Sequence, residues 1–300
     1  MKATITLTTT IFLLILMVCD AAAQNASLRD DVTRIAASVS ADVGVAVLNL
    51  DTGDTLTLRG RGHFPMQSVF KFPLAIMVLR EVDKGTLRLD QKIHLRKEDL
   101  LPNTWSPMAV KYPEGDVDIA LSEILRYTVS QSDNNGCDIL FRLVGGPGKV
   151  NDFVHSLGIT QMAIVATEAE MHQAWSVQFT NWCEPGAMAM LLKQFDRGNI
   201  LSALSREFLW KIMVETSTGP KRIKGLLPAA TVVAHKTGTG DYNAEGVMGA
   251  INDAGIMVLP DGSHVAVVVY ISRTKEKDVA RLESVIAQIS RAVYDRYANR

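Results

Sequence analysis

The chain has 300 residues, of which 47% are hydrophobic and 21% charged, with 31 Lys and Arg against 32 Asp and Glu. A net charge of −1 leaves no basic excess to drive counterion release, so neither a nucleic acid nor an anionic membrane surface is expected as the main partner. The length allows one large domain or two closely packed lobes.

The N-terminus has the pattern of a secretory signal peptide. Lys2 and a threonine-rich lead precede the apolar run 11–18, and a short alanine run ends at Ala23, where we expect cleavage. The apolar run is too short to span a bilayer. Val18 disfavours lipid attachment at Cys19, because a small residue is expected there. We therefore expect an exported protein, periplasmic or secreted, without stable membrane association.

The chain after this segment is predicted to begin with strands and to continue with helices. The runs 43–50 and 55–58 are apolar or alternating and flank a turn sequence, so they predict a hairpin. Residues 69–215 then show helical periodicity, with no strand-like alternation of comparable strength. The apolar-periodic segments, divided by Gly, Pro and Asn, lie at 74–82, 119–129, 139–144, 150–157, 188–195 and 208–214.

A serine and a lysine stand at the start of this helical block. Ser68 directly precedes the first helical pattern, so Lys71 lies one turn further along the same face and can reach the serine hydroxyl. A serine at a helix N-terminus also lies among free backbone N–H groups that favour negative charge. The Ser-x-x-Lys pattern arises often by chance, however, and Ser272 and Lys275 form a second one in a polar stretch.

A Ser-Asp-Asn string connects two of the predicted helices. Ser132, Asp133 and Asn134 fall where one helical pattern ends and the next begins, and such a connection can aim short polar side chains into a cleft. A helix cap or an Asx-turn explains the same residues without any chemistry.

A Lys-Thr-Gly string follows the apolar strand predicted at 231–234. The glycines that follow Lys236 and Thr237 would let a substrate lie against an edge strand, with the backbone N–H of Thr239 as a donor. The alternative is a strand that ends in a turn. The runs 255–259 and 265–271 predict a last hairpin, and a terminal stretch with helical spacing follows it.

Both ends of the mature chain are thus expected to contribute to one sheet. The predicted fold class is α/β (α+β), with an antiparallel sheet flanked by helices, an inserted all-helical lobe and a cleft between the lobes. Residues 24–68 and 216–300 would form the α/β lobe and residues 69–215 the helical lobe. Together they would form a single catalytic domain over residues 24–300.

Cysteine and histidine usage argues against metal chemistry. Cleavage leaves Cys137 and Cys183, which an exported protein could join. Cys137 begins an apolar helical stretch, which favours a buried free thiol over a disulfide. The six histidines never occur at ligand spacing, so we expect neither a metal site nor a cofactor.

The three strings, in this order and with a helical block between the second and the third, resemble the class A serine β-lactamases over essentially the whole mature chain. The resemblance implies a β-lactamase/transpeptidase-like fold and hydrolysis of the β-lactam amide of penicillins and cephalosporins through a serine acyl-enzyme, which confers antibiotic resistance. It also implies small-molecule β-lactam substrates, and we expect a monomer.

The resemblance assigns the acylation step to four residues. Ser68 would be the nucleophile, Lys71 its proton partner, Ser132 the proton shuttle to the leaving nitrogen, and Lys236 the cation near the substrate carboxylate. The backbone N–H groups of Ser68 and Thr239 would form the oxyanion hole.

Five further residues would bind or border the substrate in this resemblance. Asn134 would hold the amide of the substrate side chain, and Thr237 and Thr239 would bind the carboxylate region. Arg222 matches the place where some members put a guanidinium that supports carboxylate binding; the alternative is a surface arginine. Trp105 would form an aromatic wall of the cleft, unless it is buried in packing.

Glu168 would activate the water that hydrolyses the acyl-enzyme. The alternative for Glu168 is an exposed loop acid. The family usually has Asn where His172 stands, so an imidazole would help to position the water. Ala166 and Asn181 replace the Arg and Asp that usually pin this loop, which leaves its conformation open. Together with the Gln67-Ser68 and Met171-His172 pairs and Trp105-Ser106-Pro107, these departures resemble the PER/VEB-type extended-spectrum branch.

Three alternatives share the motifs. A D,D-peptidase acting on cell-wall peptides would not need Glu168. A non-hydrolysing penicillin-binding sensor normally follows transmembrane helices, and none is predicted before residue 24. A catalytically dead relative is the third. A weakly pinned loop and Thr239 lead us to expect that oxyimino cephalosporins are good substrates.

Overall fold

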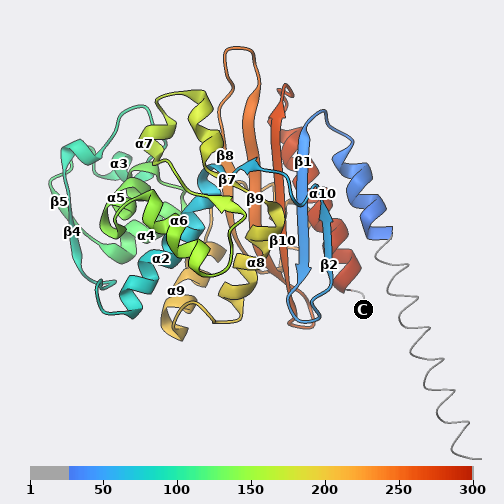
Figure 1. The fold of residues 1–300 in the computed structure, drawn as a ribbon, viewed down its shortest axis with the longest axis horizontal. Helices are drawn as coiled ribbons and strands as arrows, with labels where there is room; N and C mark the ends of the chain where they lie inside the picture. Colours follow the sequence, from blue (N-terminus) through green and yellow to red (C-terminus); the bar gives the residue numbers. More distant parts are fainter. Residues whose placement is uncertain (1–26, 299–300) are drawn as a thin grey trace, which may run out of the picture.

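A computed structural model describes residues 27–298, so the predicted signal peptide and Cys19 lie outside the described residues. The described chain forms a sheet with helices on both faces, and a helical lobe beside it (Figure 1). This arrangement confirms the predicted fold class. No helix among residues 27–298 is long and apolar enough to cross a membrane.

The main sheet has five antiparallel strands in the order β2-β1-β10-β9-β8. The strands are β1 (Asp42–Asn49), β2 (Thr55–Leu58), β8 (Val233–Thr239), β9 (Met248–Val258) and β10 (His264–Thr274). Both predicted hairpins are present, and segments from the two ends of the chain pair as β1 and β10. The sequence had predicted that the Lys-Thr-Gly string follows a strand. It lies inside the edge strand β8 instead.

Strand β9 begins seven residues before its predicted start. Its first half contains Asn252 and Asp253, which interrupt the apolar pattern although both are fully buried. Asn252 Nδ2 donates to Pro65 O at 2.7 Å, and Asp253 accepts from the backbone N–H of Ile223 at 3.1 Å. Hydrogen-bonded polar residues can therefore lie in a central strand, where a hydropathy pattern does not predict them.

The two faces of the sheet bury separate hydrophobic clusters. Helix α10 (Val279–Ala298) and the helical residues 27–36 cover one face. Helix α8 (Pro185–Asp196) covers the other face, where it contacts β1 and β10 and continues into the core of the helical lobe (Figure 1). The helical lobe and this sheet face therefore share one core.

The helical lobe packs around α2 (Lys71–Asp83), most of whose apolar side chains are buried. The helices around it are α3 (Pro107–Lys111), α4 (Leu121–Ser130), α5 (Asn134–Val144), α6 (Pro147–Ser156), α7 (Glu168–Met171) and α9 (Ala203–Val214). The short 3-10 helices η1 (Gln67–Phe70), η2 (Lys97–Asp99) and η3 (Trp175–Thr180) belong to this part of the chain, whereas η4 (Ile223–Leu226) packs against α10 on the other face of the sheet.

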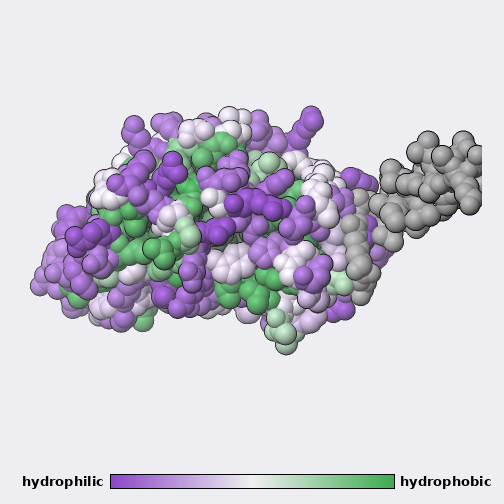
Figure 2. Space-filling model, turned by 90° about the horizontal axis from the view of Figure 1, so that it is seen from below, coloured by the Kyte–Doolittle hydropathy of each residue, from purple (hydrophilic) through white to green (hydrophobic). Residues whose placement is uncertain are grey.

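Two small sheets that the sequence did not predict lie beside these helices. One pairs β4 (Lys92–Leu95) with β5 (Val117–Ala120), and the other joins β3 (Phe64–Pro65), β7 (Trp182–Cys183) and β6 (Met162–Ala163). Strands this short carry too few residues for a recognisable alternation. Hydrophilic and hydrophobic residues alternate over the face drawn in Figure 2.

Cys137 and Cys183 are both buried free thiols, as predicted. Burial raises the pKa of the Cys137 thiol, which disfavours the reactive thiolate.

Candidate active site

Ser68 lies in η1, one turn before the fully buried Lys71 at the start of α2. Lys71 Nζ donates to Ser68 Oγ at 2.9 Å, which confirms that the two side chains touch. The same ammonium group donates to Ser132 O at 2.9 Å and to Asn134 Oδ1 at 2.5 Å, and it lies 2.8 Å from Glu168 Oε1. One buried cation therefore joins the serine hydroxyl, the Ser-Asp-Asn turn and a carboxylate.

Ser132 connects this cation to the second lysine. Its φ of 60° is in the left-handed region, which a non-glycine residue adopts rarely. Lys236 Nζ, brought from β8, donates to Ser132 Oγ at 2.8 Å and to Thr237 O at 2.9 Å. Burial and the nearby Lys71 ammonium lower the pKa of Lys236 well below its usual range.

Asp133 holds the turn from beneath, as the helix-cap alternative for the Ser-Asp-Asn string had predicted. Its fully buried carboxylate accepts from Ser106 Oγ at 2.9 Å, from Met108 N at 2.7 Å and from Gly136 N at 2.8 Å. It thereby caps α5 and ties the segment before α3 to the turn. Burial raises its pKa. Gly136, three residues after Asp133, was a sequence signal for the cap of α5, and the Ser106-Pro107 pair was a signal for the cap of α3.

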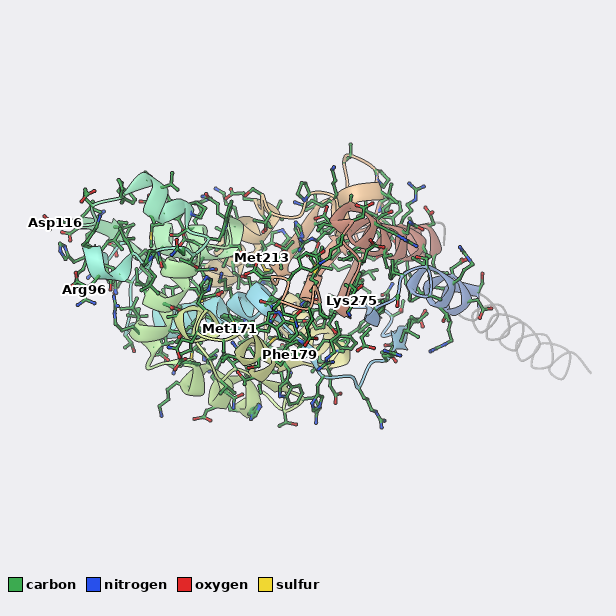
Figure 3. All side chains as sticks on the ribbon, turned by 90° about the horizontal axis from the view of Figure 1, so that it is seen from above. Arg96, Asp116, Met171, Phe179, Met213 and Lys275 are labelled. Atoms are coloured by element: carbon green, nitrogen blue, oxygen red, sulfur yellow. The ribbon has the colours of Figure 1, made fainter. Side chains whose placement is uncertain are left out.

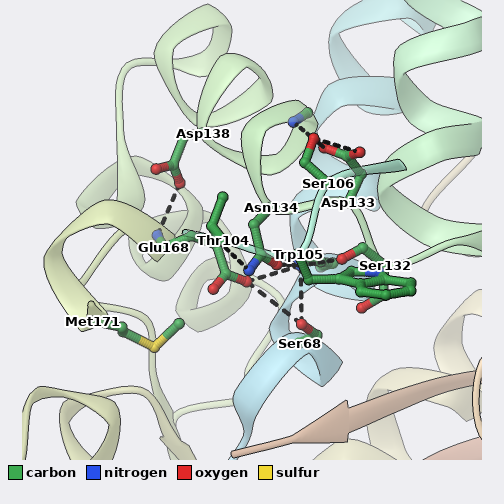
Figure 4. A network of polar contacts seen from close by, with 12 residues as sticks. Ser68, Thr104, Trp105, Ser106, Ser132, Asp133, Asn134, Asp138, Glu168 and Met171 are labelled. Carbon is green, nitrogen blue, oxygen red and sulfur yellow. Dashed lines mark hydrogen bonds and ion pairs between the residues drawn. The ribbon is translucent and has the colours of Figure 1, made fainter. Parts of the chain in front are cut away.

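Asn134 Nδ2 donates to Thr104 Oγ1 at 2.7 Å, and its backbone N–H donates to Trp105 O at 3.0 Å (Figure 4). Trp105 is 61% exposed, and its Nε1 donates to Gln131 O at 2.8 Å. The buried alternative for Trp105 is therefore wrong, and the ring lies at the rim of the site.

Glu168 is 6% exposed, so the alternative of an exposed loop acid is wrong. Its Oε1 lies 3.5 Å from Ser68 Oγ as well as close to Lys71. The backbone N–H groups of Glu168 and Ala169 donate to the two oxygens of Asp138 at 2.8 and 2.9 Å (Figure 4). Burial raises the pKa of Asp138 to about 6. Asp138 is a positioning residue that no motif had indicated.

The loop that carries Glu168, residues 165–181, is pinned by a side-chain amide. Asn181 is fully buried; its Oδ1 accepts from the backbone N–H of Val165 at 2.7 Å and of Ala166 at 2.9 Å, and its Nδ2 donates to Ala166 O at 2.8 Å. Three neutral hydrogen bonds therefore hold the loop at the two positions that departed from the family pattern.

Other contacts dock this loop against its neighbours. His172 Nε2 lies 2.9 Å from Asn103 O, and Trp175 Nε1 donates to Asp241 O at 3.1 Å. Figure 3 shows Met171 and Phe179 of this loop near the middle of the molecule, whereas Arg96 and Asp116 lie at the far tip of the helical lobe.

Arg222 is 5% exposed, so the surface alternative is wrong. Its guanidinium donates to Thr239 Oγ1 at 2.8 Å and to Gly238 O at 3.0 Å. The hydroxyls of Thr237 and Thr218 lie 2.5 Å apart. The hydroxyls of Thr237 and Thr239 and the buried guanidinium of Arg222 therefore lie along the outer end of β8.

These groups surround a cleft of about 620 Å³ between the sheet and the helical lobe. Its lining includes Ser68, Ser132, Asn134, Glu168, Thr237, Thr239, Trp105 and His172. Lys71 and Lys236 lie beneath this lining and contact Ser68 and Ser132. The arrangement offers a hydroxyl nucleophile with a base in reach, a second hydroxyl on a cation and a carboxylate near both, which suits acyl transfer. Within residues 27–298 no cluster of side chains could hold a metal ion.

Comparisons with known proteins agree with this geometry. The sequence model described as "Beta-lactamase enzyme family" matches residues 27–297. The chain is 42% identical to "Beta-lactamase VEB-1" of Pseudomonas aeruginosa, with 93% of each chain covered, and 43% identical to "Extended-spectrum beta-lactamase PER-1" of the same organism, with 92% and 89% covered.

Solved structures agree as well. A β-lactamase from Chitinophaga pinensis is 57% identical, with a TM-score of 0.87 over 90% of this chain and 98% of the other. The TLA-1 extended-spectrum β-lactamase is 50% identical, with a TM-score of 0.89 over 91% and 99%.

Proposed function

The chain belongs to the class A β-lactamases and to their PER/VEB-type branch, and we propose that it opens the β-lactam ring of penicillins and cephalosporins through an acyl-enzyme on Ser68. The observation that carries the proposal is the position of Ser68 Oγ, 2.9 Å from Lys71 Nζ and 3.5 Å from Glu168 Oε1 in a largely buried cluster.

Acylation would proceed by attack of Ser68 Oγ on the lactam carbonyl carbon. The Glu168 carboxylate is within reach of the serine proton, and Lys71 could accept that proton after passing one of its own to Glu168 across their 2.8 Å contact. The backbone N–H groups of Ser68 and Thr239 would stabilise the oxyanion. When the C–N bond breaks, Ser132 would give its proton to the leaving nitrogen while Lys236 donates to its oxygen. The proton taken from Ser68 would then pass to Ser132, which leaves Glu168 as a carboxylate for the next step.

Deacylation would use Glu168. Its carboxylate would take a proton from a water molecule whose oxygen attacks the ester carbonyl. Ser68 Oγ leaves with a proton, and the products are the free enzyme and the ring-opened acid. A D,D-peptidase or a penicillin-binding sensor has no need of this step, so a buried carboxylate beside Ser68 favours hydrolysis over both.

The charges of the site suit an anionic substrate. Lys71 pairs with Glu168 at 2.8 Å and Arg222 with Glu283 at 3.1 Å, whereas Lys236 contacts a hydroxyl and a carbonyl. Its burial and the nearby Lys71 ammonium lower the pKa of Lys236. A substrate carboxylate against Thr237 and Thr239 would supply the missing negative charge. Asn134 would contact the substrate amide, and Trp105 and His172 would border its side chain.

We further propose that oxyimino cephalosporins are substrates. The cleft extends past Thr239 to Trp175, Asp241 and Tyr242, which leaves room for a bulky acyl side chain. The similar protein PER-1 is described as extended-spectrum. We expect kcat/KM for an oxyimino cephalosporin within about tenfold of that for a simple penicillin, about 1.4 kcal/mol in transition-state binding. A value lower by several orders of magnitude would contradict this substrate range.

The test of the reaction is steady-state hydrolysis of a chromogenic cephalosporin by the mature protein and by Ser68→Ala. Many turnovers per enzyme in the wild type, and loss of turnover in Ser68→Ala, are expected. A wild type that releases one equivalent of product and stops would instead indicate a sensor or a peptidase.

We also propose that the mature protein begins after Ala23, forms a single catalytic domain over residues 24–300 and acts as a monomer in the periplasm or outside the cell. N-terminal sequencing of the exported protein and light scattering of the purified protein would test this. An uncleaved N-terminus or the mass of a dimer would contradict it.

A further inference from the structure

Two buried glutamines, Gln67 and Gln178, meet beside the nucleophile. Gln67 directly precedes Ser68, and Gln178 lies in η3 of the loop that carries Glu168. Gln67 Nε2 donates to Gln178 Oε1, and Gln178 Nε2 donates to Trp175 O at 2.6 Å. The pair is therefore a direct link between the loop and the residue before Ser68.

The backbone at Gln67 explains why such a link matters. Its φ is 49°, a left-handed conformation that a non-glycine residue holds only where its surroundings impose it. This torsion sets the direction of the next peptide group and hence of the Ser68 N–H, a donor of the proposed oxyanion hole. On the other side, Asn252 Nδ2 donates to Pro65 O at 2.7 Å and to Met66 O at 3.1 Å, which fixes the preceding backbone.

Two glycines leave the space that the two amides occupy, Gly249 in β9 and Gly240 directly after β8, and Gly238 in β8 leaves space for the backbone beside the nucleophile. A Cβ atom on Gly249 would lie 1.9 Å from Gln178 Oε1, and one on Gly240 would lie 2.7 Å from Gln67 Nε2. A Cβ on Gly238 would lie 2.5 Å from Met66 O and 3.3 Å from Ser68 N. Strands β8 and β9 therefore pack directly on the amide pair and on the backbone of the nucleophile.

We propose that Gln178 is a positioning residue for acylation. Through its hydrogen bond with Gln67 it fixes the peptide group that presents the Ser68 N–H, so the loop that carries Glu168 also supports the oxyanion hole. The inference rests on the proposed function, because it assigns a step of that same reaction. Displacing one oxyanion donor or the reacting atoms by a fraction of an ångström slows the chemical step.

The test compares shape-matched variants that lack the amide. Gln178→Met and Gln67→Met each keep the side-chain volume and remove the hydrogen bond. We expect each to lower the acylation rate constant, measured by stopped flow with a chromogenic cephalosporin, by about tenfold. Because both remove the same link, the double variant should be no slower than either single one.

Two controls separate positioning from packing. Gln173→Met changes an exposed glutamine of the same loop and should acylate at the wild-type rate. Gly249→Ala keeps both glutamines in the sequence, but its added methyl group would displace the Gln178 carboxamide. It should therefore slow acylation as Gln178→Met does. The thermal midpoint of every variant is recorded, and rates are compared well below it.

The proposal is overturned if Gln178→Met lowers only the thermal midpoint and acylates within about twofold of the wild type, or if the effects of the two single variants multiply in the double variant. These outcomes differ from failure of the proposed function. In that case the wild type itself would not turn over the cephalosporin, whereas here the wild type is active and the variants fail to differ.

Discussion

The Ser-Asp-Asn turn and the loop at 165–181 face each other across Ser68, and they are held in different ways. Beneath the turn lies the buried carboxylate of Asp133, which accepts from Ser106 and Met108 of one other segment and from Gly136 at the start of α5. The loop has several separate anchors: Asn181 at its ends, Asp138 beneath α7, and Gln178 against β8 and β9. The turn supplies groups for acylation, and the loop supplies the carboxylate proposed for deacylation.

The difference suggests how the two steps respond to change. Loss of a group that touches the central cation should disturb both halves of the site, because Lys71 contacts the turn and Glu168 alike. Loss of Asn181 or Asp138 should leave the turn unchanged and act mainly on deacylation, whereas loss of Gln178 should act on acylation, because its amide contacts Gln67 beside Ser68. Variants of Lys71, Asn181, Asp138 and His264 test this separation, in decreasing order of the expected effect on rate or stability.

Lys71→Met should have the largest effect. It removes the ammonium group that contacts Ser68, Asn134 and Glu168, and it leaves the Glu168 carboxylate buried without its cation. We expect the acylation rate constant to fall by about 10³-fold, in the range of a lost general base. Stopped-flow acylation measures it. A loss confined to deacylation would contradict the central place of Lys71.

Asn181→Ala should affect the loop alone. It leaves two backbone N–H groups and one carbonyl without their partner, and unsatisfied buried groups cost about 1–3 kcal/mol each. We expect the unfolding free energy in urea to fall by about 3 kcal/mol and deacylation to slow by about tenfold.

The companion variant for this position is Asn181→Asp, which keeps the acceptor for both N–H groups but loses the donor and brings a carboxyl group to a buried position. It should lie between the wild type and Asn181→Ala in stability. Equal slowing of acylation and deacylation in Asn181→Ala would break the proposed separation of the two regions.

Asp138 should make the stability depend on pH. Its pKa in the folded protein, about 6, is above its usual value of 3.8 because it is buried. Between pH 4 and 6 the folded protein retains a proton that the unfolded chain releases, so the Asp138 contribution to stability falls as pH rises through this window. We expect a fall of about 1–2 kcal/mol in urea titrations, absent in Asp138→Asn.

Asp138 should also make the deacylation rate depend on pH, but this rate should rise with pH where the stability falls. Protonation below pH 6 removes an acceptor from the N–H groups of Glu168 and Ala169, so deacylation should slow as pH falls. An identical acid limb in Asp138→Asn would show that Asp138 does not control it.

His264 provides the smallest expected effect, far from the site. It pairs with Asp196 at 2.6 Å and stacks on Trp210, and the hydrogen bond to Asp196 raises its pKa above 6.5. Its contribution to stability is present below pH 6.5 and is lost as pH rises through the folded pKa. His264→Gln should cost less than about 1 kcal/mol, with both rate constants unchanged.

Sequence reasoning found the residues whose chemistry depends on identity and order. Ser68, Lys71, Ser132 and Lys236 could be chosen because three short strings occur together, and they do meet in the structure. It missed the groups that hold them. Asp138 and Gln178 act through backbone or amide contacts with residues 30 and 111 positions away, and nothing local distinguishes them from solvated side chains.

The same limit affected the fold. Both hairpins, the C-terminal helix and the helical lobe follow from hydrophobic periodicity, which records burial. The first half of β9 was missed because Asn252 and Asp253 satisfy their buried polar groups through segments distant in sequence. Their burial depends on tertiary contacts that no window of the sequence contains.

The most direct test of the account is intact-protein mass spectrometry of Glu168→Gln mixed with excess chromogenic cephalosporin. Glu170→Gln, on the same short helix and exposed, is the matched control. We expect Glu168→Gln to accumulate one covalent adduct on Ser68 and to stall after one equivalent, while the wild type and Glu170→Gln consume the substrate and end free of adduct. Full turnover by Glu168→Gln without an adduct would contradict a deacylation step that depends on this loop.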